Sequence, residues 1–302
     1  MQKILISTSS FAYLDPSLIK KLEQKGLNVI LNKFGRPLKN DECLELYKDI
    51  IGVIAGTENI NSAVLKNASL LKVISRCGSG IDNIDLKTAD KSGIKIYNTP
   101  EAPALAVSEL TVGLILNLLR KINLMDRELR NGAWKKRKGN TLAGKTIGLI
   151  GFGTIGQKVA KLLSSFNCEV IFYDPRDNIS SDIKAVPLED LLKTSDIISI
   201  HISGNKQIIG QQELKLMKET VLILNLSRGG VVSEKALYEA LKTNKIGGAA
   251  LDVFENEPYQ GPLKDLDNVI VTPHIGSATK ETRLAMEKAA LDNLLSGLSI
   301  TI

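Results

Sequence analysis

Short apolar runs rich in β-branched residues alternate with amphipathic stretches from residue 3 to residue 97 of the chain. The apolar runs predict strands, and the amphipathic stretches predict helices. The expected strands are Lys3–Thr8, Asn28–Leu31, Ile51–Ala55, Lys72–Ser75 and Ile94–Tyr97. The expected helices are Pro16–Lys25, Asp41–Lys48 and Asn61–Lys66. This alternation predicts βαβ units and a mainly parallel sheet.

A second series of the same kind begins at Lys145. Its expected strands are Thr146–Ile150, Val170–Tyr173, Ile197–Ile200, Val221–Asn225, Ala249–Val253 and Val269–Val271. Helices are expected around Ile155–Ser165, Leu188–Lys193, Gln212–Met217 and Glu234–Thr243, and a last helix at Lys280–Leu295. Six strands are typical of a doubly wound dinucleotide-binding fold. The pattern predicts an α/β protein with two doubly wound, parallel-sheet domains, as its 302 residues suggest at about 150 per domain.

Between the two series, one long helical pattern runs from Pro103 to Arg130. Pro103 suits a first helical turn, and Gly132 suits a helix end. A helix this apolar must be covered, either by the core of its own chain or by a second subunit. The pattern alone leaves these two alternatives open.

The composition, 43% hydrophobic and 24% charged, is that of a soluble globular protein and excludes disorder. The longest nearly uninterrupted apolar stretch, Leu114–Leu119, is far shorter than the ~20 residues of a membrane span. The start, MQKILISTSS, predicts a first strand and not a signal peptide. Three cysteines without metal-binding spacing predict reduced thiols in a cytoplasmic protein, and no metal site.

The net charge is +6, and the densest basic run is Lys135–Lys138. No aromatic-basic motif accompanies it, so we expect no nucleic-acid partner. A Lys-rich surface and attraction of a small anionic substrate remain alternative explanations of the charge.

The segment GFGTIG (residues 151–156) follows the apolar strand Thr146–Ile150 and opens the helix Ile155–Ser165. The next strand ends at Asp174, 18 residues after Gly156. This is the layout of a dinucleotide site. An acidic residue there accepts hydrogen bonds from the adenosine ribose and repels a 2′-phosphate, so NAD is the expected cofactor.

Each part of this loop has a predicted role. Gly151 allows the tight turn, Gly153 lets the backbone approach the pyrophosphate, and Gly156 lets helix and strand pack closely. The N–H groups of Thr154 and Ile155 lie at the helix N-terminus, where negative charge is favoured.

Four polar residues stand at or just after predicted strands of the second series. His201 and His274 are the two histidines of the chain, and His is the side chain best suited to proton transfer near neutral pH. Arg228, beside two glycines, can hold a carboxylate bidentately. Glu257 precedes His274 by 17 residues. His201 alone is more typical of a structural histidine, but Arg, Glu and His at successive strand ends predict an active site.

The motifs NLSRG (225–229), LDVFENEP (251–258) and TPHIG (272–276), in this order behind GFGTIG, resemble those of the D-isomer-specific 2-hydroxyacid dehydrogenases. The segment SRCGSGIDNID (75–85) resembles the substrate loop of this family. The resemblance covers nearly the whole chain. It implies an NAD-dependent enzyme that moves a hydride between nicotinamide C4 and substrate C2.

The resemblance also implies the catalytic roles. Arg228 binds the substrate carboxylate and polarises the keto oxygen, and His274 exchanges a proton with that oxygen. Glu257 pairs with His274. The implied cofactor set, besides the glycine loop and Asp174, is His201, Ser227, Asp252 and Gly276. The implied substrate-binding residues are Arg76, Cys77, Gly78 and Ser79, and the backbone N–H groups around the last three would hold the carboxylate.

The family architecture implies a Rossmann cofactor domain, residues 98–280, inserted in a flavodoxin-like substrate domain, residues 1–97 and 281–302, with the active site in the cleft. The family dimerises through the cofactor domain, which favours Pro103–Arg130 as the interface of a homodimer.

Within the family, the chain most resembles the phosphoglycerate dehydrogenase branch, which makes 3-phosphohydroxypyruvate for serine synthesis. It would be a short form without the C-terminal regulatory domain. Arg76 and Lys135–Lys138 are candidates for the phosphate, although a charge run is often only solvated surface. Glyoxylate, hydroxypyruvate and D-lactate enzymes share these motifs. An NAD-sensing corepressor, a binding protein with little turnover, is the alternative of another class.

Overall fold

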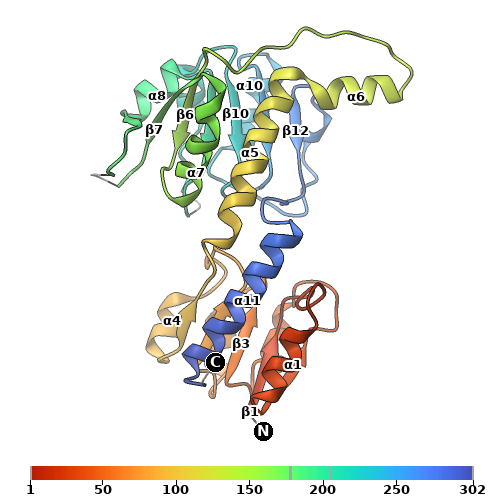
Figure 1. The fold of residues 1–302 in the computed structure, drawn as a ribbon, viewed down its shortest axis with the longest axis vertical. Helices are drawn as coiled ribbons and strands as arrows, with labels where there is room; N and C mark the ends of the chain where they lie inside the picture. The colour runs from red at the N-terminus through yellow and green to blue at the C-terminus, as the bar shows by residue number, and fades with distance from the viewer. Residues whose placement is uncertain (1, 177–178, 205, 301–302) are drawn as a thin grey trace. The chain divides into compact units, whose positions relative to one another are not determined.

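The computed structural model describes residues 2–176, 179–204 and 206–300 and contains two α/β units (Figure 1). Unit 1 comprises Met1–Pro103 and Ala278–Ile302, and unit 2 comprises Ala104–Ser277. These boundaries lie a few residues from those expected after residues 97 and 280. Both units are parallel sheets with helices on both faces, so the predicted fold class is confirmed.

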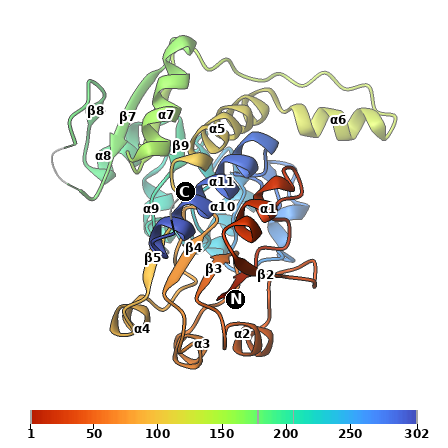
Figure 2. The same cartoon turned by 60° about the horizontal axis from the view of Figure 1, so that its bottom comes forward.

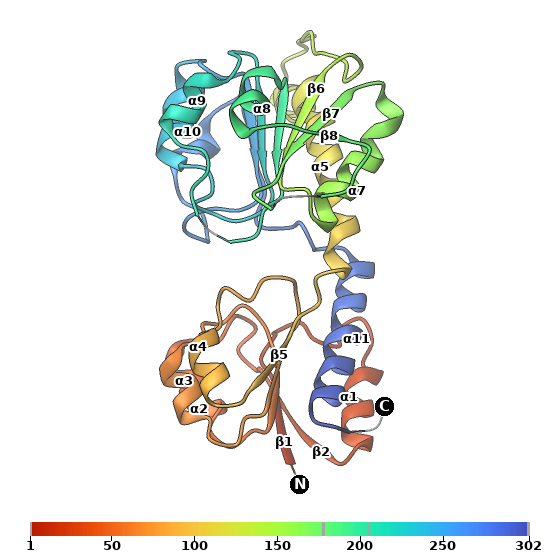
Figure 3. The same cartoon turned by 90° about the vertical axis from the view of Figure 1, so that its left-hand side faces the viewer.

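Unit 1 is a five-stranded parallel sheet with the strand order β2-β1-β3-β4-β5. The strands are β1 (Gln2–Ile6), β2 (Leu27–Leu31), β3 (Gly52–Ala55), β4 (Val73–Arg76) and β5 (Lys95–Tyr97). The helices are α1 (Ser17–Gln24), α2 (Asn40–Leu46), α3 (Ser62–Asn67), α4 (Leu86–Lys91) and α11 (Lys280–Gly297). One sheet face packs against α1 and α11, and the other against α2, α3 and α4 (Figure 3).

The central strand of unit 1 shows why the sequence forms this layer structure. All four residues of β3 are buried, because a parallel strand inside the sheet is covered on both faces. At Gly52 a Cβ would lie 2.7 Å from the Leu294 side chain of α11. Glycine at this position therefore lets α11, the last helix of the chain, pack closely on the sheet built by the first hundred residues.

Unit 2 is a seven-stranded parallel sheet with the strand order β12-β11-β10-β9-β6-β7-β8. The strands are β6 (Thr146–Ile150), β7 (Glu169–Tyr173), β8 (Lys184–Ala185), β9 (Ile197–Ile200), β10 (Leu222–Asn225), β11 (Gly248–Leu251) and β12 (Val269–Val271). The order reverses between β6 and β9, and ligands of such sheets bind at the carboxyl ends of the strands at this point. The strand β8 is absent from the sequence prediction, because two exposed residues carry no apolar pattern.

The helices of unit 2 are α5 (Ala102–Arg120), α6 (Ile122–Arg130), α7 (Thr154–Leu163), α8 (Leu188–Thr194), α9 (Gln211–Leu216) and α10 (Glu234–Lys242). Two short 3₁₀ helices, η1 (Ser164–Phe166) and η2 (Pro262–Asp265), complete it. Residues of α5 and α7 pack on one sheet face, and those of α8, α9 and α10 pack on the other.

The prediction of one helix from Pro103 to Arg130 is wrong, because α5 ends at Arg120 and α6 begins at Ile122. Between them Lys121 adopts the left-handed conformation, with φ of +54°. Arg120 and Lys121 are both good helix formers, so the local sequence carries no signal for the break. By length and composition alone α5 is apolar enough to cross a membrane, and half of it is buried inside the protein, as in a core helix.

Beyond the break, α6 and the segment after it project from the sheet of unit 2 (Figures 1 and 2). Leu124 is the buried residue of α6, whereas Ile122 and Leu129 are exposed. Residues 133–141 form no regular element, and Trp134 is 79% exposed. The core of the chain thus covers about half of α5, and apolar side chains of α6 are left in solvent.

A buried carboxylate of α11 fastens the loop after β1. Glu287 is fully buried, and its oxygens accept from Arg283 Nε at 2.6 Å and from the Ala12 N–H at 3.0 Å. We expect Glu287→Ala to lower the free energy of unfolding by about 3 kcal/mol, because both donors lose a buried partner. Urea unfolding measures this, with Lys288→Ala on the exposed side of the helix as the control. Equal losses in the two variants would contradict the expectation.

Candidate active site

The loop between β6 and α7 places each of its three glycines under a different constraint. Gly151 has φ of +98°, and a Cβ there would lie 2.6 Å from the His201 carbonyl oxygen. At Gly156 a Cβ would collide with the Gly151 carbonyl oxygen. At Gly153, among the described residues apart from its chain neighbours, the Arg176 guanidinium is the one group within 4 Å of the Cβ position, so the backbone is open to a ligand. These are the tight turn, the close helix packing and the open approach that a pyrophosphate site needs.

The other predicted members of the loop are the first residues of α7, Thr154 and Ile155. Their N–H groups lie among the first donors of the helix, which have no partner within it and favour an anion. The loop therefore fits the diphosphate of NAD.

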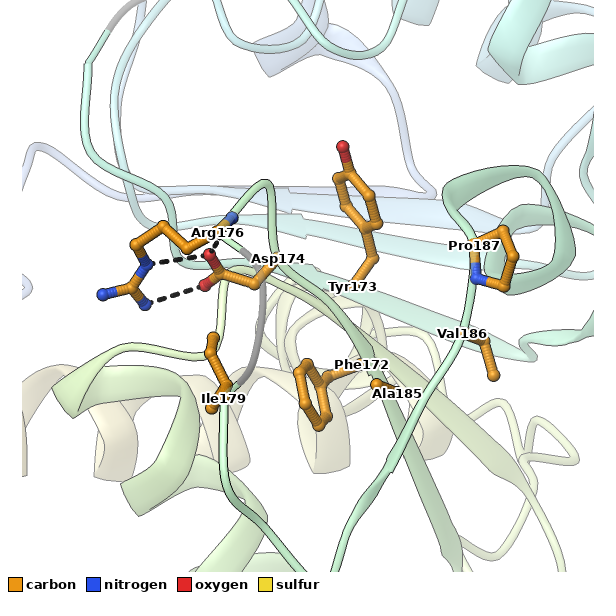
Figure 4. A pocket seen from close by; sticks show the side chains of 8 residues that line it. All are labelled: Phe172, Tyr173, Asp174, Arg176, Ile179, Ala185, Val186 and Pro187. Carbon is orange, nitrogen blue, oxygen red and sulfur yellow. Dashed lines mark hydrogen bonds and ion pairs between the residues drawn. The ribbon is translucent and has the colours of Figure 1, made fainter.

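Asp174 follows β7 and is held from two sides, of which Figure 4 shows the contact with Arg176. Its Oδ2 accepts from the Phe152 N–H of the glycine loop at 2.7 Å. Arg176 forms a bidentate ion pair with it, with Nε–Oδ1 and Nη2–Oδ2 distances of 2.9 Å. This hydrogen-bonded pair lowers the pKa of the Asp174 carboxyl to about 2. Beside it lies a pocket of about 310 Å³ lined by Phe172, Tyr173, Asp174, Arg176, Ile179, Ala185, Val186 and Pro187.

The structure brings Glu257 and His274 together. Glu257 Oε2 lies 2.8 Å from His274 Nδ1, and Glu257 Oε1 accepts from the Phe254 N–H at 3.1 Å. Both side chains are partly exposed, so the pair is accessible to a small molecule. His274 has φ of +54°, which is rare for a residue other than glycine. In this conformation the loop after β12, which carries His274, approaches the loop after β11, which carries Glu257.

Asp252, at the end of β11, maintains that conformation. Its buried carboxylate accepts from the N–H groups of Ile275 and Gly276, both at 2.8 Å, and from Thr272 Oγ1 at 2.6 Å. Asp252 and Gly276 therefore bind each other in this structure, and their contact with the cofactor stays a prediction. Sequence reasoning missed the role of Asp252 in holding the histidine loop. The signal that could have predicted this role is the position of Asp252, an acid directly after one strand and next to the loop that follows the neighbouring strand.

Arg228 lies in the loop after β10, which Asn225 shapes. The Asn225 side chain accepts from the Ser227 N–H and Oγ and donates to the Arg228 carbonyl oxygen at 2.9 Å. A Cβ at Gly229 would collide with the Phe254 carbonyl oxygen, so the arginine loop packs directly on the glutamate loop. The loops of Arg228, Glu257 and His274 are therefore neighbours at one edge of the sheet. The role of Asn225 was not predicted.

His201, expected near the cofactor, is a buried residue whose Nε2 lies 2.8 Å from Ser199 Oγ. Burial lowers the pKa of the His201 imidazole to about 4. Its backbone borders the glycine loop, as the Gly151 contact shows, while its ring faces the interior. A contact of this ring with the cofactor remains a prediction.

The predicted substrate loop belongs to unit 1 and follows β4. The Cys77 N–H bonds to the Ala55 carbonyl oxygen at 2.9 Å, and the Gly78 N–H bonds to Thr99 Oγ1 at 2.8 Å. Two of the N–H groups expected to hold the substrate carboxylate thus have partners inside unit 1. The Asn98 amide fixes the loop further by donating to the Ser79 carbonyl oxygen at 2.7 Å. Burial raises the pKa of the Cys77 thiol to about 11, so it is not a reactive thiolate.

Across residues 2–176, 179–204 and 206–300, no three His, Cys, Asp or Glu side chains are placed to hold a metal ion. Unit 2 combines an open glycine loop, an acid after the second strand and a Glu–His pair at the same sheet edge. These features are typical of a dinucleotide-dependent oxidoreductase, a class of enzyme in which a histidine suits proton exchange.

Comparison with known proteins gives the family. Residues 112–276 match the NAD-binding domain of the D-isomer-specific 2-hydroxyacid dehydrogenases. Hydroxypyruvate reductase of Thermotoga maritima is 37% identical over 92% of this chain and 96% of its own length. D-3-phosphoglycerate dehydrogenase of Methanocaldococcus jannaschii is 41% identical over 94% of this chain and 55% of its own length. The crystal structure of the TT0316 protein of Thermus thermophilus covers 99% of this chain and 97% of its own at 33% identity and a TM-score of 0.92.

The chain therefore belongs to the D-isomer-specific 2-hydroxyacid dehydrogenase family. It is an NAD-dependent oxidoreductase acting on the CH–OH group of 2-hydroxy acids.

The buried His201 predicts a dependence of stability on pH. Its folded pKa of about 4 lies below the usual 6.5, so the unfolded chain takes up the proton first. The contribution of the neutral, buried His201 to the free energy of unfolding is complete above pH 6.5 and is lost as the pH falls toward 4. Between pH 7.5 and 5, we expect wild type to lose about 2 kcal/mol more unfolding free energy than His201→Gln.

Urea unfolding at the two pH values measures this difference. Because the chain has two histidines, NMR titration of the imidazoles checks the pKa in wild type directly. Identical losses in the two proteins, or a His201 ring that titrates near 6.5, would contradict the burial argument.

Proposed function

We propose that Arg228, Glu257 and His274 are the catalytic residues of this dehydrogenase and that its substrate pair is 3-phosphoglycerate and 3-phosphohydroxypyruvate. The observation that supports the catalytic assignment most is the 2.8 Å contact between Glu257 and His274. The loop that carries Glu257 also packs against the loop of Arg228. A carboxylate that accepts from Nδ1 orients the imidazole and leaves Nε2 to exchange a proton with the substrate.

NAD would be held by the glycine loop and Asp174, and it would supply the acceptor for the hydride of the hydroxy acid. The protein residues manage the carboxylate and the proton. Arg228 holds the substrate carboxylate by its guanidinium, which fixes C2 and its oxygen. During oxidation His274 takes the hydroxyl proton as the C2–H bond breaks, and Glu257 stabilises the imidazolium that forms. During reduction His274 returns this proton to the keto oxygen.

The relative from Methanocaldococcus jannaschii, named D-3-phosphoglycerate dehydrogenase, supports the phosphorylated substrate. The candidates for the phosphate are Arg76 and the exposed run Lys135–Lys138. Hydroxypyruvate or glyoxylate is the second candidate. The relative from Thermotoga maritima is named hydroxypyruvate reductase, and Arg137 of the basic run already pairs with Glu128, with an Nε–Oε2 distance of 2.8 Å.

We also propose a cytoplasmic homodimer formed through the α5–α6 region. The exposed apolar side chains Leu105, Ile122, Leu129 and Trp134 support such a contact. The alternative of an NAD-sensing corepressor makes a different prediction, since such a protein would assemble with NAD and turn over substrate at a negligible rate.

We expect His274→Ala and Arg228→Ala each to lower kcat/KM at least about 100-fold, because each removes a group that acts on the reacting atoms. The Kd for NADH, followed by fluorescence, should change little. Lys235→Ala, an exposed charge on α10, is the matched control and should keep wild-type values. Near-normal kcat/KM in either variant would refute its assignment.

The substrate is tested by NADH absorbance with 3-phosphoglycerate against D-lactate, D-glycerate and 2-hydroxyglutarate. The reverse direction uses 3-phosphohydroxypyruvate, hydroxypyruvate and glyoxylate. A preference in kcat/KM for the phosphorylated pair that Arg76→Gln abolishes would support the proposal. A preference for unphosphorylated acids would leave the chemistry intact and overturn the phosphate assignment, and negligible turnover of every acid would favour the binding protein.

A further inference from the structure

The acid expected to face the adenosine ribose is not an isolated carboxylate. Both oxygens of Asp174 pair with the guanidinium of Arg176 in a bidentate arrangement (Figure 4). Such fork-to-fork pairs are stronger and more directional than a single contact between point charges. The net formal charge of the pair is zero, so the local electrostatics differ from those of a lone aspartate.

The two members of this pair differ in exposure to solvent. The Asp174 side chain is 5% exposed and is tied to the glycine loop by the Phe152 N–H. The Arg176 side chain is 64% exposed, and its head is held by Asp174. The carboxylate is therefore enclosed by the protein, whereas the guanidinium is open to solvent on a long stem and can contact a second anion beside Asp174.

The position of the guanidinium matters for the ligand. Arg176 Nη2 lies 3.8 Å from the Cβ position of Gly153, the glycine through which the pyrophosphate approaches the backbone. The same side chain lines the pocket beside β7, with Tyr173 and Val186. Arg176 therefore lies close to both the glycine loop and this pocket. It also lies next to the carboxylate that would bind the ribose hydroxyls.

An isolated aspartate discriminates against NADP(H) because its charge repels the 2′-phosphate. Here that charge is balanced, and the balancing group is the side chain best suited to bind a phosphate bidentately. We propose that Arg176 enables this dehydrogenase to accept NADP(H) as a second cofactor, by binding the 2′-phosphate while it stays beside Asp174 and balances its charge. The inference rests on the proposed role of Asp174 at the ribose.

The test is fluorescence titration of the whole protein with NADPH and NADH. We expect the wild-type Kd for NADPH to lie within about tenfold of that for NADH. Arg176→Gln should weaken NADPH binding about 10- to 100-fold, the range of a charge-assisted bidentate contact, and change NADH binding less than about threefold. Lys184→Gln, which removes the same charge from the neighbouring exposed strand β8, is the matched control and should leave both Kd values unchanged.

Three outcomes would overturn the inference. The first is a wild-type Kd for NADPH more than about 1000-fold above that for NADH, as an unbalanced aspartate would give. The second is an equal loss of both cofactors in Arg176→Gln, which indicates a general role in the fold of the loop. The third is an equal loss of NADPH binding in Lys184→Gln, which indicates diffuse surface charge and not this contact.

The variant Asp174→Asn tests the premise, the role of Asp174 at the ribose, separately from the inference about Arg176 and the 2′-phosphate. If this variant weakens NADH binding while Arg176→Gln has no selective effect, Asp174 contacts the ribose and the role of Arg176 is wrong. If it leaves NADH binding unchanged, the ribose role of Asp174 is wrong, and the inference about Arg176 falls with it.

Discussion

Parallel strand pairing in unit 2 is the constraint on which the rest of the site depends. In a parallel sheet all strands end at the same edge, so the loops after β6, β7, β10, β11 and β12 emerge together although they are spread over 125 residues, from Gly151 to Ile275. The strand order reverses between β6 and β9, which places the glycine loop where the sheet opens. The pairing register, and not contact between the functional side chains, aligns these strand ends.

At that edge, carboxylates set the finer geometry by binding backbone N–H groups. Asp174 holds the glycine loop through Phe152, and Asp252 holds the histidine loop through Ile275 and Gly276. Glu257 holds its own loop and also contacts the histidine. One of its oxygens accepts from the Phe254 N–H, and the other contacts His274. Charge-assisted bonds of this kind are short and directional, which explains how irregular loops hold a fixed shape. The acids to which we assign chemical roles therefore also hold the backbone of these loops.

The sequence predicted regular elements better than the breaks in them. Strands such as Thr146–Ile150 agree with the structure to the residue, because a buried parallel strand needs a continuous apolar run. The left-handed Lys121, which divides α5 from α6, was not foreseen, because its neighbours favour a helix. The two-residue strand β8 was missed for the opposite reason, since it is too short to have a pattern.

The sequence by itself determined the class of fold, the glycine loop and which residue types stand at strand ends, because periodicity and local spacing are properties of the chain. Tertiary structure alone decided how those residues are paired. Arg228, Glu257 and His274 are far apart in sequence, and only strand order makes their loops neighbours. The same holds for Asp252, whose carboxylate binds backbone groups 23 and 24 residues away, and for the burial of His201. Such contacts follow from packing, which one-dimensional spacing does not encode.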